Sequence, residues 1–155
     1  MKKTLKIAFL MDPLENLDLK GDTTFALALE AQNRGHEIFF LKTDHLILRY
    51  NEVYARICKM ELSSTRGLNN FKYFEETISS LSEYDVVMMR QDPPFDLSYI
   101  TATHILEKLP KSTLVVNNPV KVRNAPEKLF VTNFSDLMPK TLITRDLQSI
   151  HSFRD

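Results

Sequence analysis

The chain has 155 residues, of which 43% are hydrophobic and 26% charged, a composition typical of a globular domain with a substantial core. Its 20 basic and 20 acidic residues form no long block of either sign, which argues against nucleic acid or an anionic membrane as a partner. The apolar N-terminal stretch stops at Asp12 and Pro13 without a small-residue cleavage site, so we interpret it as a buried strand, not a signal peptide. Cys58 is the only cysteine, which excludes an intrachain disulfide and thiolate metal clusters and fits a cytoplasmic setting.

The N-terminal part of the chain alternates between strand and helix patterns. We predict a strand over Leu5–Met11, a helix capped by Asp22 and ended by Gly35, and a strand over His36–Lys42. Two further strand-like runs between Leu46 and Leu62 flank Tyr50-Asn51-Glu52, where Asn51 can adopt a left-handed conformation. This pattern predicts a β-hairpin inserted in the α/β arrangement.

The remaining segments are less uniform. Ser63–Tyr84 is polar with scattered aromatic residues and no clean period, so we predict loop and short helix there. The other predicted elements are strands over Val86–Arg90, Thr113–Asn117 and Lys140–Thr144, and helices over Leu97–Leu109, Glu127–Phe134 and after Asp146.

Alternating strands and helices indicate an α/β fold whose open, mostly parallel sheet is covered by helices on both faces. Ligands of such sheets bind beyond the carboxyl ends of the strands. We therefore expect Met11–Pro13, Arg90–Asp96 and Val116–Pro119 to share one rim, because each directly follows a predicted strand.

Glycine usage excludes two nucleotide-binding motifs. Only Gly21, Gly35 and Gly67 occur, so neither a G-x-G-x-x-G fingerprint nor a Walker A loop is present. The four histidines have no spacing typical of a zinc site. These observations argue against a dinucleotide-binding domain, a P-loop enzyme and a zinc centre.

The rim carries the remaining polar chemistry. Asp12 can cap a neighbouring turn or bind a ligand's ammonium group. Arg90, Asp92 and Asp96 surround a rigid Pro-Pro turn, where the guanidinium can bind a substrate carboxylate or pair internally with an aspartate. Both interpretations stay open for these residues. Away from the rim, Lys128 taken alone is typical of a solvated surface lysine.

Several blocks of sequence, in order, resemble bacterial glutathione synthetases. They include M-D-P, D-T-T-F-A-L-A-L-E-A-Q-N-R-G, M-R-Q-D-P-P-F-D, V-N-N-P and N-A-P-E-K-L-F. The resemblance implies a Rossmann-like pre-ATP-grasp domain over residues 1–124 and the start of an ATP-grasp domain over residues 125–155. It also implies a ligase reaction, in which ATP phosphorylates the C-terminal carboxylate of γ-glutamylcysteine and the amine of glycine attacks the acyl phosphate.

The resemblance assigns expectations to individual residues. Lys128 matches the family lysine that reaches the nucleotide phosphates, and Asp12, Arg90, Asp92 and Asp96 match positions on the substrate side of the cleft. The complete enzyme is expected to use ATP and Mg²⁺, but the metal ligands, the second phosphate-binding lysine and the lid loop of this family have no counterpart in these 155 residues.

We therefore expect the chain alone to be inactive and to need an ATP-grasp domain as its partner; the sequence leaves a homo-oligomer open. The family's N-K-P is replaced here by N-N-P, which removes a positive charge at Asn118 near the rim. Two alternatives remain: the N-terminal domain of another ATP-grasp carboxylate–amine ligase, and a non-catalytic binding or assembly module with the same fold.

Overall fold

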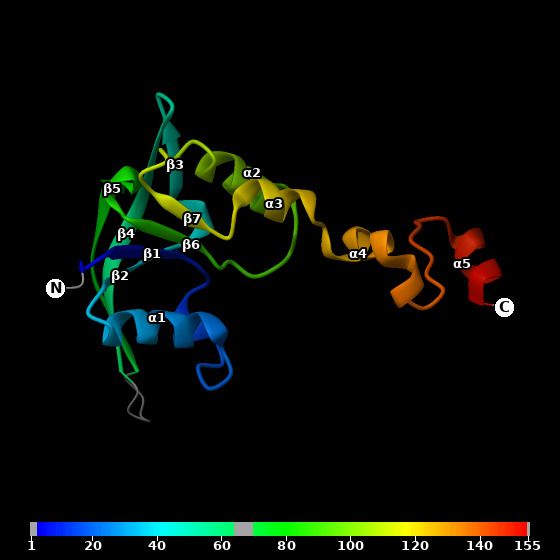
Figure 1. Ribbon diagram of the computed structural model, residues 1–155, viewed down its shortest axis with the longest axis horizontal. Helices are drawn as coiled ribbons and strands as arrows, with labels where there is room; N and C mark the ends of the chain where they lie inside the picture. Colours follow the sequence, from blue (N-terminus) through cyan, green and yellow to red (C-terminus); the bar gives the residue numbers. More distant parts are fainter. Residues whose placement is uncertain (1–2, 64–69, 155) are drawn as a thin grey trace. The chain divides into compact units, whose positions relative to one another are not determined.

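The computed structural model describes residues 3–63 and 70–154, apart from the side chain of Glu127. The chain divides into two compact units, Met1–Arg123 and Asn124–Asp155. The first unit is built around a sheet and the second contains short helices (Figure 1).

The sheet of the first unit has seven strands within the described residues, in the order β3-β4-β2-β1-β6-β7, with β5 paired to β4. Their bounds are β1 Lys6–Leu10, β2 Glu37–Leu41, β3 Leu46–Arg49, β4 Glu52–Leu62, β5 Phe71–Ser80, β6 Val86–Met89 and β7 Leu114–Val116. The neighbours β2, β1, β6 and β7 run parallel, whereas β3, β4 and β5 extend the sheet with antiparallel pairs.

Helices cover both faces of this sheet, as predicted. Helix α1 (Thr23–Asn33) lies on one face, and α2 (Leu97–Leu106) and α3 (Pro119–Asn124) lie on the other (Figure 1). Short 3-10 turns η1 (Leu14–Asn16), η2 (Thr43–His45) and η3 (Leu81–Glu83) complete the first unit. The expected open α/β fold is confirmed.

Strand β1 shows why the sequence folds in this way. Ile7 and Phe9 point into the core beneath α1, where they meet Ala28 of that helix. Ala8 and Leu10 belong to the opposite core, which contains buried residues of the α2 side. Since side chains alternate along a strand, a continuous apolar run is what a strand buried on both faces requires.

The predicted hairpin is present between β3 and β4. Arg49 pairs with Glu52, so the connection is a two-residue turn, and both of its residues have positive φ, 51° at Tyr50 and 66° at Asn51. Positive φ at both central positions is the geometry that matches the twist of two antiparallel strands. Strand β4 continues past the hairpin and pairs with β2 and β5 as well.

The prediction for Ser63–Tyr84 was wrong over most of the described part of that segment. Phe71–Ser80 forms β5, and residues 64–69 lie outside the described residues. The strand lacks a clear period because it is mostly exposed, and because its register with β4 shifts between Cys58 and Met60. Such a bulge interrupts the alternation from which a strand is normally predicted.

The second unit consists of α4 (Glu127–Phe130), η4 (Val131–Leu137) and α5 (Leu147–Arg154). The predicted helix over Glu127–Phe134 therefore changes to 3-10 geometry, and Phe134 is non-helical, at φ −121° and ψ 47°. Asp146 does cap α5, since its Oδ2 accepts a hydrogen bond from Ser149 N at 2.8 Å. The predicted strand Lys140–Thr144 was wrong: this segment has no strand structure, because a strand needs a backbone partner and none of the described residues provides one.

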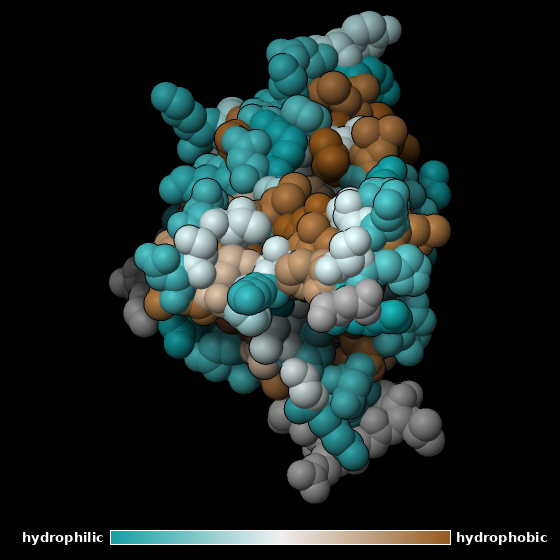
Figure 2. All heavy atoms as spheres, turned by 90° about the vertical axis from the view of Figure 1, so that its right-hand side faces the viewer, coloured by the Kyte–Doolittle hydropathy of each residue, from teal (hydrophilic) through white to brown (hydrophobic). Residues whose placement is uncertain are grey.

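The second unit has no buried side chain among those described. Its exposed large apolar side chains are Leu129, Phe130, Val131, Phe134, Leu137, Leu142, Ile143, Leu147, Ile150 and Phe153. Figure 2, which views the molecule from the side of α5 in Figure 1, shows apolar side chains gathered on that face. This density of exposed apolar groups is typical of a surface that packs against other polypeptide.

Candidate functional site

The ends of β1 and β6 bring Asp12 and Arg90 to the same edge of the sheet. The two strands are parallel neighbours in which Leu10 pairs with Met89. Beyond them, Arg90 N donates to Leu10 O at 2.8 Å and Asp92 N donates to Asp12 Oδ2 at 3.1 Å. The prediction that Asp12 and Arg90 share one rim is confirmed, and one Asp12 oxygen has the structural role of fixing the loop after β6.

The Arg90 side chain is held by two hydroxyl groups at the start of α1. Its Nε donates to Thr24 Oγ1 at 3.0 Å and its Nη2 donates to Thr23 Oγ1 at 2.7 Å. Thr24 is buried, Thr23 is exposed and Arg90 is half-buried. Among the described residues, no carboxylate lies within 4.0 Å of the Arg90 guanidinium, so the internal Arg–Asp pair considered from the sequence is not formed there.

Sequence reasoning missed both threonines. They are separated from Arg90 by 67 and 66 positions, and only the fold brings the start of α1 to the end of β6. The available signal was the D-T-T motif, in which Asp22 caps the helix through a 2.6 Å bond from Phe25 N. The hydroxyl groups that follow this cap orient the guanidinium without neutralising its charge.

Asp96 serves mainly as the cap of α2. Its Oδ1 accepts a hydrogen bond from Tyr99 N at 2.9 Å, and the Tyr99 ring packs on Phe95 with centroids 5.0 Å apart. Burial raises the pKa of Tyr99, while the Arg90 charge lowers this pKa and the Asp92 charge raises it. Both charges therefore act on the Tyr99 phenol, which sequence reasoning had not included in the site.

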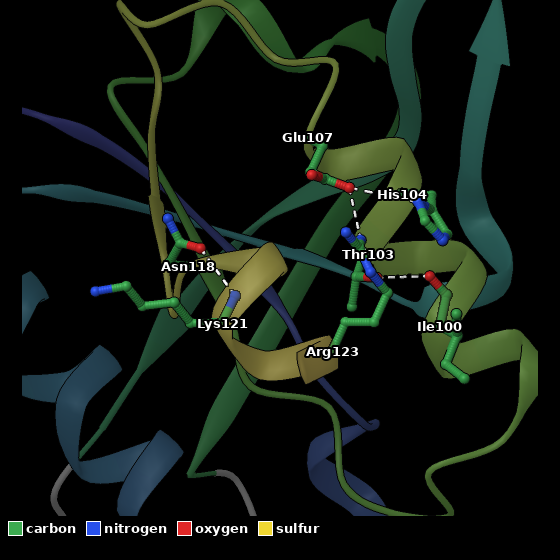
Figure 3. A network of polar contacts seen from close by, with 7 residues as sticks. All are labelled: Ile100, Thr103, His104, Glu107, Asn118, Lys121 and Arg123. Carbon is green, nitrogen blue, oxygen red and sulfur yellow. Dashed lines mark hydrogen bonds and ion pairs between the residues drawn. The ribbon is translucent and has the colours of Figure 1, made fainter. Parts of the chain in front are cut away.

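The third strand end is occupied by structural contacts. Asn117 Nδ2 donates to Met89 O at 3.3 Å, and Asn118 Oδ1 accepts a hydrogen bond from Lys121 N at 3.0 Å (Figure 3). Asn118, at the position where the resembled family has lysine, thus caps the turn that opens α3.

A polar network fixes α3 to α2 at the end of the first unit (Figure 3). Arg123 Nη1 donates to Glu107 Oε2 at 2.6 Å and to Thr103 Oγ1 at 3.2 Å, and His104 Nδ1 lies 3.4 Å from the same Glu107 oxygen. Thr103, which is fully buried, donates in turn to Ile100 O at 2.6 Å. The hydrogen bond from Arg123 holds the pKa of Glu107 below its ordinary value. Arg123 is also the last residue of the unit, so this network anchors the chain where the unit ends.

Three other features of the described residues are relevant. Cys58 is buried, and burial raises the pKa of its thiol to about 11, which agrees with an inert structural cysteine. Among the residues described, no group of three or more histidine, cysteine, aspartate or glutamate side chains could hold a metal ion. None of the helices described is both long and apolar enough to cross a bilayer.

The second unit carries a groove of about 850 Å³. Its lining residues are Lys128, Val131, Phe134, Leu137, Met138, Pro139, Thr141, Leu142, Ile143 and Thr144. Lys128 is exposed and is the only cationic residue of this otherwise largely apolar lining. The structure thus puts Lys128 on the second unit and the four rim residues on the first.

The fold and the rim define an α/β domain that presents polar groups beyond the carboxyl ends of parallel strands, as ligand-binding domains of this class do. Comparison with known families makes this specific. Residues 5–123 match the family model "Prokaryotic glutathione synthetase, N-terminal domain", and the chain belongs to this family. The match ends at the last residue of the first unit.

Curated relatives agree with the family assignment. A glutathione synthetase of Rhodopseudomonas palustris is 52% identical over 97% of this chain and 48% of its own length. One of Mesorhizobium japonicum is 53% identical with the same coverage, and one of Escherichia coli strain K12 is 41% identical over 96% of this chain and 47% of its own length. The chain spans about half the length of the curated relatives it matches.

Proposed function

We propose that this chain is the N-terminal half of a glutathione synthetase, the ligase that joins γ-glutamylcysteine to glycine at the expense of ATP. The observation that carries the proposal is the similarity to relatives of that name, which extends over 97% of the chain. The proposed setting is the cytoplasm, where ATP is available.

The proposed reaction has two steps. A carboxylate is a poor electrophile, so its oxygen first attacks the γ-phosphorus of ATP, and ADP leaves. The neutral amine of glycine then attacks the acyl carbon, phosphate leaves with the bonding electron pair, and the nitrogen releases one proton to give the amide. Magnesium would neutralise charge on the transferred phosphoryl group in the complete enzyme, but the described residues do not form an oxygen cage that fits it.

Each unit has a proposed part in this reaction. The first unit would hold the substrate at the rim formed by Asp12, Arg90 and Asp92. The second would be the opening segment of an ATP-grasp domain, from residue 125 onward. The exposed apolar side chains of the second unit support this assignment, because the remainder of such a domain would cover them.

Lys128 is the proposed nucleotide contact. Its ammonium group would bind the phosphates of ATP, which supplies positive charge where negative charge develops during transfer. An exposed ion pair contributes only about 0–1 kcal/mol. Lys128 alone therefore cannot sustain catalysis, and the isolated chain should be inactive.

Complementation tests the proposal. The 155-residue chain would be mixed with the second half of the Rhodopseudomonas palustris relative, and glutathione and ADP would be measured in the presence of ATP and Mg²⁺. We expect background turnover from either half and ATP-dependent ligation from the mixture. Ligation by the chain alone would refute the expected inactivity. A properly folded mixture without ligation would favour the non-catalytic binding module.

Lys128→Ala provides the site-specific control. In the complemented enzyme the rest of the ATP-grasp domain would shield Lys128 from water, and a hydrogen bond to a charged group then contributes about 1.5–3 kcal/mol, so this variant should lower kcat/KM for ATP roughly 10- to 100-fold. Lys140→Ala, an exposed lysine of the same unit, should leave it unchanged. Equal effects of the two substitutions would contradict a specific role for Lys128.

A further inference from the structure

Arg90 is a half-buried cation without a counter-ion among the described residues. Its Nε and one hydrogen of Nη2 are used by the two threonines. Within the described residues, the Nη1 group and the second Nη2 hydrogen make no recorded hydrogen bond. These two groups form the edge of the guanidinium fork that binds a carboxylate through two parallel hydrogen bonds.

An acidic residue, Asp92, follows this cation by two positions in the loop after β6 and is not paired with it. The backbone of Asp92 is tethered by Asp12, which fixes the loop that carries the Asp92 carboxylate. That carboxylate is exposed and accepts no recorded hydrogen bond within the described part of the chain. Arg90 N is bonded to Leu10 O at the end of β1 and Asp92 N to Asp12 just beyond it, so the backbones of a cation and an anion two positions apart are fixed at one place on the rim.

We propose that Arg90 and Asp92 bind a zwitterionic α-amino-acid head group, with Thr23 and Thr24 as positioning residues for Arg90. The ligand's carboxylate binds the free edge of the guanidinium, and its ammonium group binds Asp92.

This inference rests on the proposed function, and it selects one end of one substrate. γ-Glutamylcysteine carries an α-amino-acid head group on its glutamyl end. Glycine is also a zwitterion, but its amine must be neutral and free in order to attack the acyl phosphate. A site that holds an ammonium ion against a carboxylate would keep the glycine amine protonated, so the glutamyl end is the ligand that fits.

The assignment also orients the substrate. In an extended dipeptide the cysteinyl carboxylate lies about 7 Å from the glutamyl α-carbon, as standard bond lengths require. The first unit therefore holds the unreactive end, while the carboxylate to be phosphorylated points away from Arg90.

Three ligands test the head-group assignment on the 155-residue chain by NMR titration. They are γ-glutamylcysteine, glutarylcysteine, which lacks the amine, and γ-aminobutyrylcysteine, which lacks the α-carboxylate. We expect γ-glutamylcysteine to shift the amide signals of Asp92 and Tyr99, and each analogue to bind at least tenfold more weakly. Equal binding of all three, or no change at the rim with any of them, would overturn the proposal.

Variants separate a positioning role from a merely structural one. Arg90→Lys keeps the charge but loses the fork, so the preference for γ-glutamylcysteine over γ-aminobutyrylcysteine should fall about tenfold. Thr23→Val should reduce the same preference. Thr23→Ser should keep it at the wild-type value, because serine retains the hydroxyl group. Thr23 is exposed, so both of these variants are expected to fold.

Arg56→Lys, an exposed arginine on β4, is the matched control and should change nothing. A preference that survives Arg90→Lys would overturn the site. The titration does not depend on catalysis, so its failure is distinct from failure of the proposed ligase: the complemented enzyme can make glutathione while all three ligands bind alike. In the opposite case, selective binding without ligation would retain the head-group site and reject the ligase.

Discussion

The β3–β4 turn contains a residue whose replacement should stabilise the protein. Tyr50 has φ 51° and its side chain is 95% exposed, so it adopts a left-handed conformation and has little packing to lose. That conformation costs an L-residue other than glycine or asparagine about 1–2 kcal/mol. Asparagine tolerates it because its short side chain bonds to the local backbone. Tyr50→Asn should therefore raise the free energy of unfolding by roughly 0.5–1 kcal/mol.

Thermal and urea unfolding measure this change directly. A gain of 1 kcal/mol corresponds to a Tm increase of about 2–6 °C for a domain of this size, and the urea midpoint should rise without a change in slope. Tyr54→Asn is the contrasting variant, because Tyr54 lies in β4 and its ring packs against the Arg49 guanidinium at 4.5 Å. It should lower stability. An unchanged or lower midpoint for Tyr50→Asn would refute the argument from backbone strain.

Four further predictions concern other parts of the fold. Arg123 lowers the pKa of Glu107, so the stability from this pair is complete above the unfolded pKa near 4.5 and is lost as pH falls through the folded value; Glu107→Gln should make the urea midpoint less dependent on pH below about 4.5. Gln32 bonds to both backbone groups of Leu62 at 2.8 Å, so Gln32→Leu should cost roughly 1–3 kcal/mol in urea unfolding, and an effect near zero would contradict that reading. Cys58 should resist iodoacetamide at pH 8 in the native protein and react fully in urea, since its pKa is about 11 and it is buried. In hydrogen exchange, the amides of residues 124–154 should exchange faster than those of β1, because that unit buries none of its described side chains; equal protection would contradict the difference.

The fold was predictable where burial produces a run of consecutive apolar residues in the sequence. Strand β1 is buried on both faces, and β6 is buried on one face and half-buried on the other, so both are apolar runs in the sequence, followed by Asp12-Pro13 and Asp92-Pro93. Strand β5 was missed because an exposed strand with a shifted register has no period to detect. The opposite error occurred at Lys140–Thr144, where the apolar pair Leu142 and Ile143 suggested a strand but no strand partner exists among the described residues. Pairing is a property of the whole chain, and local composition does not report it.

The rim was predictable in position but not in internal arrangement. The carboxyl ends of parallel strands lie at one edge of a sheet, and this rule correctly predicted that Asp12 and Arg90 are close together. The partners of Arg90 could not be inferred, because Thr23 lies 67 positions away and hydroxyl groups occur throughout the sequence. The capping role of Asp96 was accessible, since an aspartate before a helical pattern is a common N-cap. Interpreting Asp96 as an N-cap would have identified it as a structural residue and left Asp12 and Asp92 as the aspartates available to a ligand.

The two units differ in what they need in order to function. The first has a core on each face of its sheet, and its rim is positioned by hydrogen bonds within that unit. The proposed ligand recognition at the rim therefore depends on contacts that the first unit already contains. The second exposes the apolar side chains that line its groove, so the surroundings of Lys128 depend on polypeptide that would cover them. In the proposed function, binding of the substrate head group and activation of its far carboxylate thus rest on separate structural requirements, and this chain should perform the first without the second.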